Sequence, residues 1–119
     1  MTVRHEELRE RTKQFALRAI KVFRALPRAV EAQVLGKQLL RSATSVAANY
    51  RAVGRARSRA EFTAKLGVVV EETDESVFWL ELLGDAGILP KNRLDDLLRE
   101  ARELLAIFAA SQRTVRRPR

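Results

Sequence analysis

The sequence predicts an all-α protein that folds as an antiparallel, up-down-up-down four-helix bundle. Ala, Leu, Arg and Glu, which favour helices, dominate its 119 residues, while Gly and Pro number only 5 and 3. Apolar side chains recur at steps of three and four along four long segments, which is the pattern of helices with one buried face. Helix-breaking residues separate these segments: Pro27, Gly54 and a cluster of Gly84, Gly87 and Pro90.

The first two helices follow from this spacing. In the first segment the apolar stripe runs from Leu8 to Leu26 in alternating steps of four and three, as on the inner face of a bundle helix. The second helix is expected from about Arg28 to about Val53, because apolar residues repeat at threes and fours along it.

The third and fourth helices also carry start signals. Ser58 and Glu61 have the spacing of a capping box, in which each side chain bonds an unpaired amide of the first turn. The fourth helix follows Pro90, which suits a first helical turn, and its pattern fades after Ala110. Short loops leave an antiparallel arrangement as the only return path. We therefore expect one bundle over residues 1–112 and a basic, disordered C-terminal tail over residues 113–119.

Several classes of function are excluded by composition. Without cysteine the chain has no disulfide, thiolate nucleophile, zinc knuckle or iron–sulfur cluster. The apolar run at Val68–Val70 is far too short to cross a bilayer, and the charged N-terminus predicts a cytoplasmic protein. The single histidine, His5, has no partner for a catalytic triad or for a bundle metal site. We expect no enzymatic activity, no cofactor and no metal.

Charge is distributed unevenly along the chain. The net charge is +8, with +9 over residues 1–57, −5 over residues 58–87 and +4 over residues 113–119. A basic surface rich in arginine attracts phosphates and releases their counterions, while few aromatics interleave with the charges, so we expect contacts to the backbone and shape of a nucleic acid. The candidate nucleic-acid-binding residues are Lys21, Arg24, Arg41, Arg51, Arg55, Arg57, Arg113, Arg116 and Arg117. The alternative is a protein-interaction scaffold, without a nucleic-acid role, whose basic helices dock onto the acidic third helix of adjacent subunits.

A second set of residues suggests an interface or a polar groove. Ser42, Ser45 and Asn49 form a polar line inside the second helix, which is explained either by a close helix crossing with Asn49 bonding across it, or by a groove for a ligand or partner. Adjacent Phe78 and Trp79 point in different directions, so at least one leaves the core, as at a subunit interface. The third helix adds carboxylates expected to pair with arginines of a neighbouring helix or subunit, including Glu72 and Glu75.

The middle of the chain resembles a known family. The similarity is carried by QLLRSATSVAANYR over residues 38–51, then by residues 55–58, 61–66 and 71–76, and extends from about Phe15 to Leu83. These motifs resemble the four-helix-bundle proteins encoded in intervening sequences of bacterial 23S ribosomal RNA genes. The chain has YRAVG at residues 50–54, where many members end the helix with an Ile-Ala-Glu-Gly type sequence, so it resembles a variant branch.

The resemblance implies a homopentamer of antiparallel bundles with no enzymatic activity and a largely unassigned role. More distantly, in fold and charge, the chain is similar to the accessory variability determinant of diversity-generating retroelements, a basic pentameric bundle. That likeness implies RNA or DNA and a protein such as a reverse transcriptase as partners. The positions matching the family motifs are Arg41, Ser42, Ser45, Asn49, Arg51, Arg55, Ser58, Phe62, Lys65, Glu72, Glu75 and Trp79. We therefore expect a non-enzymatic, oligomeric bundle that binds structured RNA or another nucleic acid.

Overall fold

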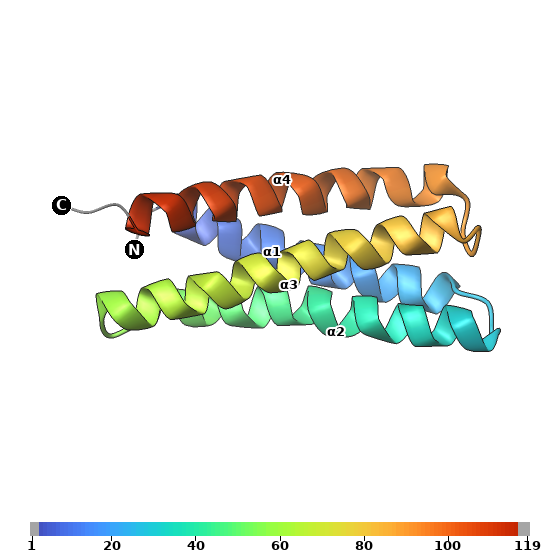
Figure 1. Cartoon of the computed structure of the whole chain (residues 1–119), viewed down its shortest axis with the longest axis horizontal. Helices are drawn as coiled ribbons and strands as arrows, with labels where there is room; N and C mark the ends of the chain where they lie inside the picture. The colour runs from blue at the N-terminus through green and yellow to red at the C-terminus, as the bar shows by residue number, and fades with distance from the viewer. Residues whose placement is uncertain (1–2, 117–119) are drawn as a thin grey trace.

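The computed structural model describes residues 3–116, which form four long helices. They are α1 (Val3–Ala25), α2 (Val30–Val53), α3 (Arg59–Asp85) and α4 (Lys91–Arg116). Successive helices run antiparallel and lie side by side, giving a rod of 50 × 22 × 21 Å (Figure 1). The predicted all-α four-helix bundle is confirmed. No helix within residues 3–116 combines the length and apolar character needed to cross a membrane.

The helix starts follow the predicted local signals. Ser58 has an extended backbone before α3, and its hydroxyl accepts a hydrogen bond from the Glu61 amide at 3.1 Å, which is one half of the capping box. The Glu61 carboxylate instead lies 3.8 Å from the Arg57 guanidinium. The Pro90 carbonyl accepts from the Arg93 amide at 3.0 Å, so Pro90 stands at the entrance to α4 as expected.

Helix α4 continues through residues 113–116, beyond the boundary predicted at residue 112. Val115 packs against the core, and Arg59 at the start of α3 donates a hydrogen bond to the Val115 carbonyl at 2.6 Å. These two contacts give the last turn a tertiary partner that the local sequence does not reveal. The rest of the predicted tail, residues 117–119, lies outside the described residues.

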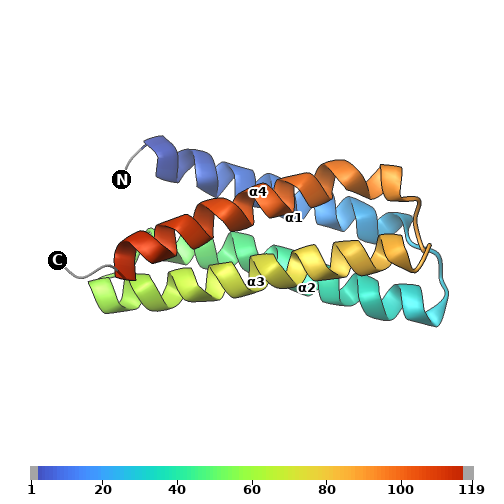
Figure 2. The ribbon, with the colours of Figure 1, turned by 45° about the horizontal axis from the view of Figure 1, so that its top comes forward.

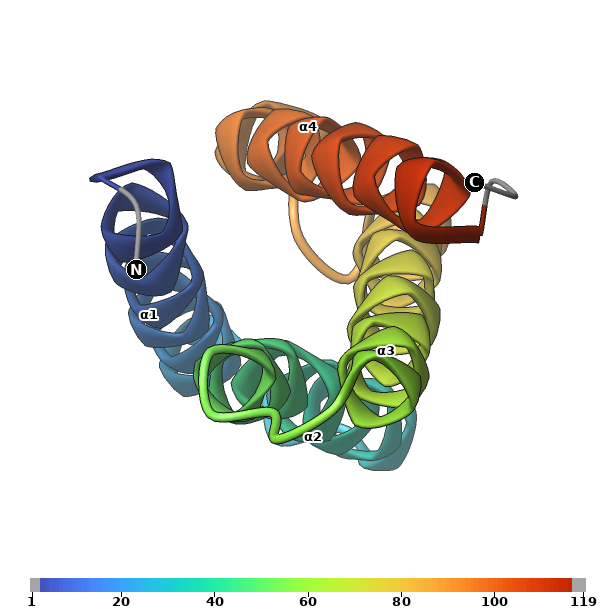
Figure 3. The ribbon, with the colours of Figure 1, turned by 90° about the vertical axis from the view of Figure 1, so that its left-hand side faces the viewer.

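The core is built by the predicted apolar stripes. Phe15, Leu39, Leu66, Leu80 and Phe108 are among its largest fully buried side chains, and together they draw on all four helices. Three of the neighbouring pairs pack along most of their lengths, whereas α1 and α4 share few contacts. Seen from one end, α4 crosses from a position near α1 to a position above α3 (Figure 3). The same divergence of α1 and α4 is visible in Figure 2.

A salt bridge spans the sparse α1–α4 seam at mid-length. The Arg11 guanidinium donates to both carboxylate oxygens of Glu100, at 2.6 and 3.1 Å. This bidentate geometry fixes the relative position of the two helices where apolar packing is thin. Beyond it, toward the free ends of α1 and α4, the two helices separate (Figure 2).

Candidate nucleic-acid interface

One end of the rod collects arginines from three separate parts of the chain. We call it the basic end and define it by Arg51, Arg55, Arg57, Arg113 and Arg116, all of which are exposed. The first three come from the end of α2 and from the loop before α3, and the last two from the final turns of α4. Because the helices alternate in direction, the α2–α3 loop and the C-terminal turns of α4 meet at the same end (Figure 1). Antiparallel topology thus joins residues far apart in the sequence.

Local structure helps to explain why these arginines stand there. Arg51, Arg113 and Arg116 lie in the last turns of α2 and α4, where the unpaired carbonyls of a helix carry partial negative charge. Cations are stabilising in such positions, so part of this basic character serves the helices themselves.

The charges of the basic end are largely uncompensated. Arg57, whose side chain is 89% exposed, approaches Glu61 only to 3.8 Å. Arg51, Arg55, Arg113 and Arg116 make no ion pair with any other residue of the described range 3–116. The guanidinium groups are therefore available to an anionic partner.

Not all of the candidate nucleic-acid-binding residues lie at the basic end. Lys21 and Arg24 are exposed near the C-terminal end of α1, which is the opposite end of the rod (Figure 1). Arg41 lies at mid-length on α2, and its guanidinium contacts Glu72 at 3.1 Å and Glu75 at 2.6 Å on α3. These carboxylates occupy Arg41 within the chain. Arg117 lies outside the described residues.

Of the polar line of α2, only Ser42 forms a side-chain hydrogen bond to α3 within the described residues. Ser42 is completely buried, and its hydroxyl accepts a hydrogen bond at 3.0 Å from the Ser76 hydroxyl of α3. Asn49, which was expected to bond across the crossing, instead donates to the carbonyl and the hydroxyl of Ser45 within α2, each at 2.9 Å. Ser42 therefore lies in the contact between α2 and α3, as the crossing interpretation expects, whereas Asn49 bonds within its own helix.

The two adjacent aromatics of α3 do point in different directions. Phe78 is 51% exposed, whereas Trp79 is half-buried against the core. Their rings meet edge to face with centroids 4.9 Å apart. Phe78 is therefore the aromatic side chain that leaves the core.

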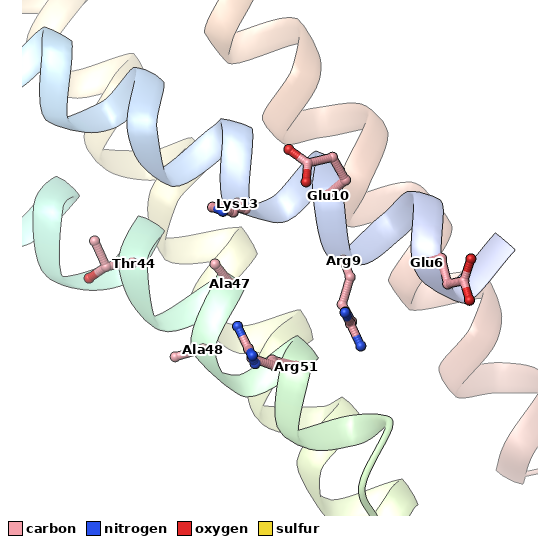
Figure 4. A pocket seen from close by; sticks show the side chains of 8 residues that line it. All are labelled: Glu6, Arg9, Glu10, Lys13, Thr44, Ala47, Ala48 and Arg51. Atoms are coloured by element: carbon pink, nitrogen blue, oxygen red, sulfur yellow. The ribbon is translucent and has the colours of Figure 1, made fainter. Parts of the chain in front are cut away.

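A groove that the sequence did not predict lies between α1 and α2. Its volume is about 470 Å³, and both helices line it with residues three, four and seven apart. Arg9 and Arg51 extend into the space between the two helices (Figure 4). The lining side chains are Glu6, Arg9, Glu10, Lys13, Thr44, Ala47, Ala48 and Arg51. Carboxylates and cations are mixed along α1, so this groove has no single-sign field.

A second cavity, of about 510 Å³, opens at the basic end itself. It is lined by residues of all four helices and of the α2–α3 loop. Its apolar walls include Leu8, Tyr50, Val53 and Phe62, and its polar groups are Arg4, His5 and Ser111. The alternating directions of the helices could have indicated this grouping, because the start of α1 must lie beside the end of α2. Residue types alone gave no such signal.

A series of ring contacts, from His5 through Tyr50 to Phe108, connects the cavity lining with the core. The His5 Nδ1 and the Tyr50 hydroxyl form a hydrogen bond of 2.9 Å, and their ring centroids lie 4.9 Å apart. Tyr50 in turn stacks on buried Phe108 at 5.1 Å. Gly54 makes room for the histidine, because a Cβ at this position would collide with the His5 ring. Burial, followed by the charge of Arg9, lowers the pKa of His5 from its ordinary value.

Within residues 3–116 no group of three or more His, Cys, Asp or Glu side chains is placed to hold a metal ion. Glu72 and Glu75 of α3 instead pair with Arg41 of α2, and Glu81 pairs with Arg102 of α4. The basic end thus combines exposed arginines with an open hollow that apolar side chains partly line.

Comparison with known proteins agrees with this fold. No curated protein sequence matches the chain. The crystal structure of a protein of unknown function from the S23 ribosomal protein family of Bacteroides thetaiotaomicron is similar to nearly the whole molecule. It is 28% identical, with a TM-score of 0.84, and the match covers 92% of this chain and 97% of that one. The family model of 23S rRNA-intervening sequence proteins matches residues 4–110. The chain therefore belongs to the 23S rRNA-intervening sequence protein family.

Proposed function

We propose that this protein is a non-enzymatic, cytoplasmic homo-oligomer whose basic end binds the phosphate backbone of structured RNA. The observation that carries the proposal is the meeting of five exposed arginines at one end of the rod, where only Arg57 approaches a carboxylate of the described chain. Arginine presents a planar fork of donors that matches two phosphate oxygens at once. Such contacts release condensed counterions and give an affinity that falls steeply with salt.

The surface favours backbone contacts over a row of stacked bases. The large apolar side chains exposed within residues 3–116 are Leu17, Val30, Val34, Val68 and Phe78, and none of them belongs to the basic end. Proteins that bind long single strands need a series of exposed aromatic platforms. The basic end therefore suits a folded RNA that presents phosphates close together.

A salt titration tests the proposal. A labelled RNA hairpin is titrated with the protein between about 50 and 200 mM salt. We expect affinity to fall with salt, and the combined substitution Arg55→Gln, Arg57→Gln and Arg113→Gln to weaken binding at least about tenfold. Each lost phosphate contact should reduce the salt slope by about 0.9. The matched control, Lys21→Gln with Arg24→Gln, removes cations from the other end and should retain affinity within about twofold.

Arg41→Gln gives a further comparison in the same titration. Its guanidinium is already held by Glu72 and Glu75, so we expect RNA affinity to stay unchanged. The partly exposed ion pairs should cost less than about 1 kcal/mol in the free energy of unfolding when they are lost. Absence of binding at low salt, an affinity indifferent to salt, or an equal loss in the Lys21 and Arg24 variant would contradict the proposal.

Self-association is the second part of the proposal and is supported by a separate feature. Phe78 leaves half of an aromatic side chain in water on α3, and such exposed apolar area commonly marks a subunit interface. We expect light scattering to give a multiple of the 13.5 kDa protomer mass, with five protomers as the expected number. Phe78→Ser should shift the distribution toward the protomer. A wild-type mass near 13.5 kDa would contradict self-association.

A further inference from the structure

We propose that the cavity at the basic end holds the base of one unpaired nucleotide, while the surrounding arginines hold the phosphates on either side of it. This inference rests on the proposed function and specifies its ligand. The preferred RNA would carry a bulged or terminal unpaired nucleotide, and a continuous duplex would bind through its backbone alone.

The size and lining of the cavity fit a flat heterocycle. Its volume of about 510 Å³ lies within the roughly 300 to 1,000 Å³ of small-molecule sites, which are mostly apolar with a few placed polar groups. Phe62, which is only partly buried, supplies aromatic surface for stacking, and buried Leu8, Tyr50 and Val53 complete the apolar lining. Unpaired RNA bases are commonly bound by stacking on such side chains.

One polar group can bond the edge of a base. The Ser111 hydroxyl, which lines the cavity, donates its hydrogen to the Ile107 carbonyl at 3.0 Å. Its oxygen lone pairs remain as acceptors, so Ser111 can accept a hydrogen bond from an N–H group of the base.

The charges around the cavity complement a nucleotide better than an apolar ligand. Arg4 lines the cavity directly, and Ala56 of its wall lies between Arg55 and Arg57. A lipid tail or an apolar peptide would fill the cavity and leave these cations without partners. In a nucleotide, the flat face of the base can contact the apolar lining, and the flanking phosphates can contact the arginines.

The cavity wall is preorganised by the core. Tyr50 is buried, its ring stacks on Phe108, and its hydroxyl bonds His5. The His5 ring in turn occupies the space that a Cβ on Gly54 would need. Because these side chains are already held in place, binding a base would order few additional groups, which lowers the entropic cost of association.

The experiment compares two hairpin RNAs that differ by a single bulged adenosine. We expect the wild-type protein to bind the bulged hairpin about tenfold more tightly, which is the order of one base stacking on an aromatic side chain. Ala56→Phe places a ring in the cavity and should bring the ratio of the two affinities close to one. Ala60→Phe adds the same ring to an exposed position of α3 that does not line the cavity, and should keep the tenfold ratio.

The outcomes separate this inference from the proposed function. Equal, salt-sensitive binding of both hairpins by the wild type, or a tenfold ratio that persists in Ala56→Phe, overturns the nucleotide cavity and leaves backbone binding standing. No salt-sensitive binding of either RNA overturns both. If Ala56→Phe does not fold, Phe62→Leu removes the aromatic face while keeping an apolar wall, and should lower the ratio at least about threefold. An unchanged ratio in a folded Phe62→Leu protein counts against the cavity.

Discussion

Phe108→Ala is expected to lower the free energy of unfolding by about 3–5 kcal/mol. Phe108 on α4 is 1% exposed, and its ring stacks on Tyr50 of α2 at a centroid distance of 5.1 Å. Replacing the ring with a methyl group removes buried apolar area and leaves a cavity that the long helices can only partly close. The same substitution removes the support on which Tyr50 and His5 rest.

Urea denaturation measures the change, with the wild type and the variant compared at one protomer concentration because self-association adds to apparent stability. Phe108→Leu is the matched variant. It keeps most of the apolar volume and should lose clearly less than Phe108→Ala, by about 1.5 kcal/mol or less. A loss below about 1 kcal/mol for Phe108→Ala would show that this end of the bundle is loosely packed and would contradict the structure.

Ser42→Leu is expected to destabilise the fold by about 3 kcal/mol. Ser42, Thr73 and Ser76 are all completely buried where α2 crosses α3, and such small side chains allow the two backbones to approach closely. A leucine would push α2 and α3 apart at this buried contact. It would also remove the hydroxyl that donates to the Leu39 carbonyl at 3.2 Å and accepts from Ser76 at 3.0 Å.

Ser45→Leu provides the control, because Ser45 lies on the same helix but is only half-buried. Its hydroxyl accepts from Asn49, which keeps the Ser45 carbonyl as a second acceptor. We expect a change of less than about 1 kcal/mol in the same denaturation experiment, since Asn49 keeps one acceptor and the half-buried position leaves part of the larger side chain in solvent. Equal losses of unfolding free energy for Ser42→Leu and Ser45→Leu would mean that the α2–α3 contact can accommodate a leucine, which would contradict the complete burial of Ser42.

Predicting the helices from the sequence succeeded because each depends on local periodicity. The apolar stripe that starts at Leu8 and the Ser58 cap can be predicted from residues a few positions apart, and the structure shows them along α1 and at the start of α3. The end of α4 was not readable in this way. Its last turn is held by contacts of Val115 with the core and with Arg59, which is remote in the sequence.

For the candidate site, too, the sequence predicted which residues are basic, but tertiary contacts decided which of them are unpaired. Arg51, Arg55, Arg57, Arg113 and Arg116 were all chosen for their charge, and the structure gathers them at one end of the rod. Arg41 was chosen for the same reason. Its guanidinium forms ion pairs with Glu72 and Glu75, because α3 brings those carboxylates alongside α2. Whether a cation is free depends on its neighbours across the bundle.

By itself, the sequence determined that the chain forms four amphipathic helices joined by short loops and that arginines outnumber its carboxylates, since periodicity and net charge are properties of composition and order alone. Only the tertiary structure decided which arginines stay open to a partner and that His5, Tyr50, Phe62 and Ser111 surround one cavity. The physical reason is that ion pairing and enclosure require atoms within a few ångströms of one another, and in a bundle such neighbours come from helices remote in the sequence.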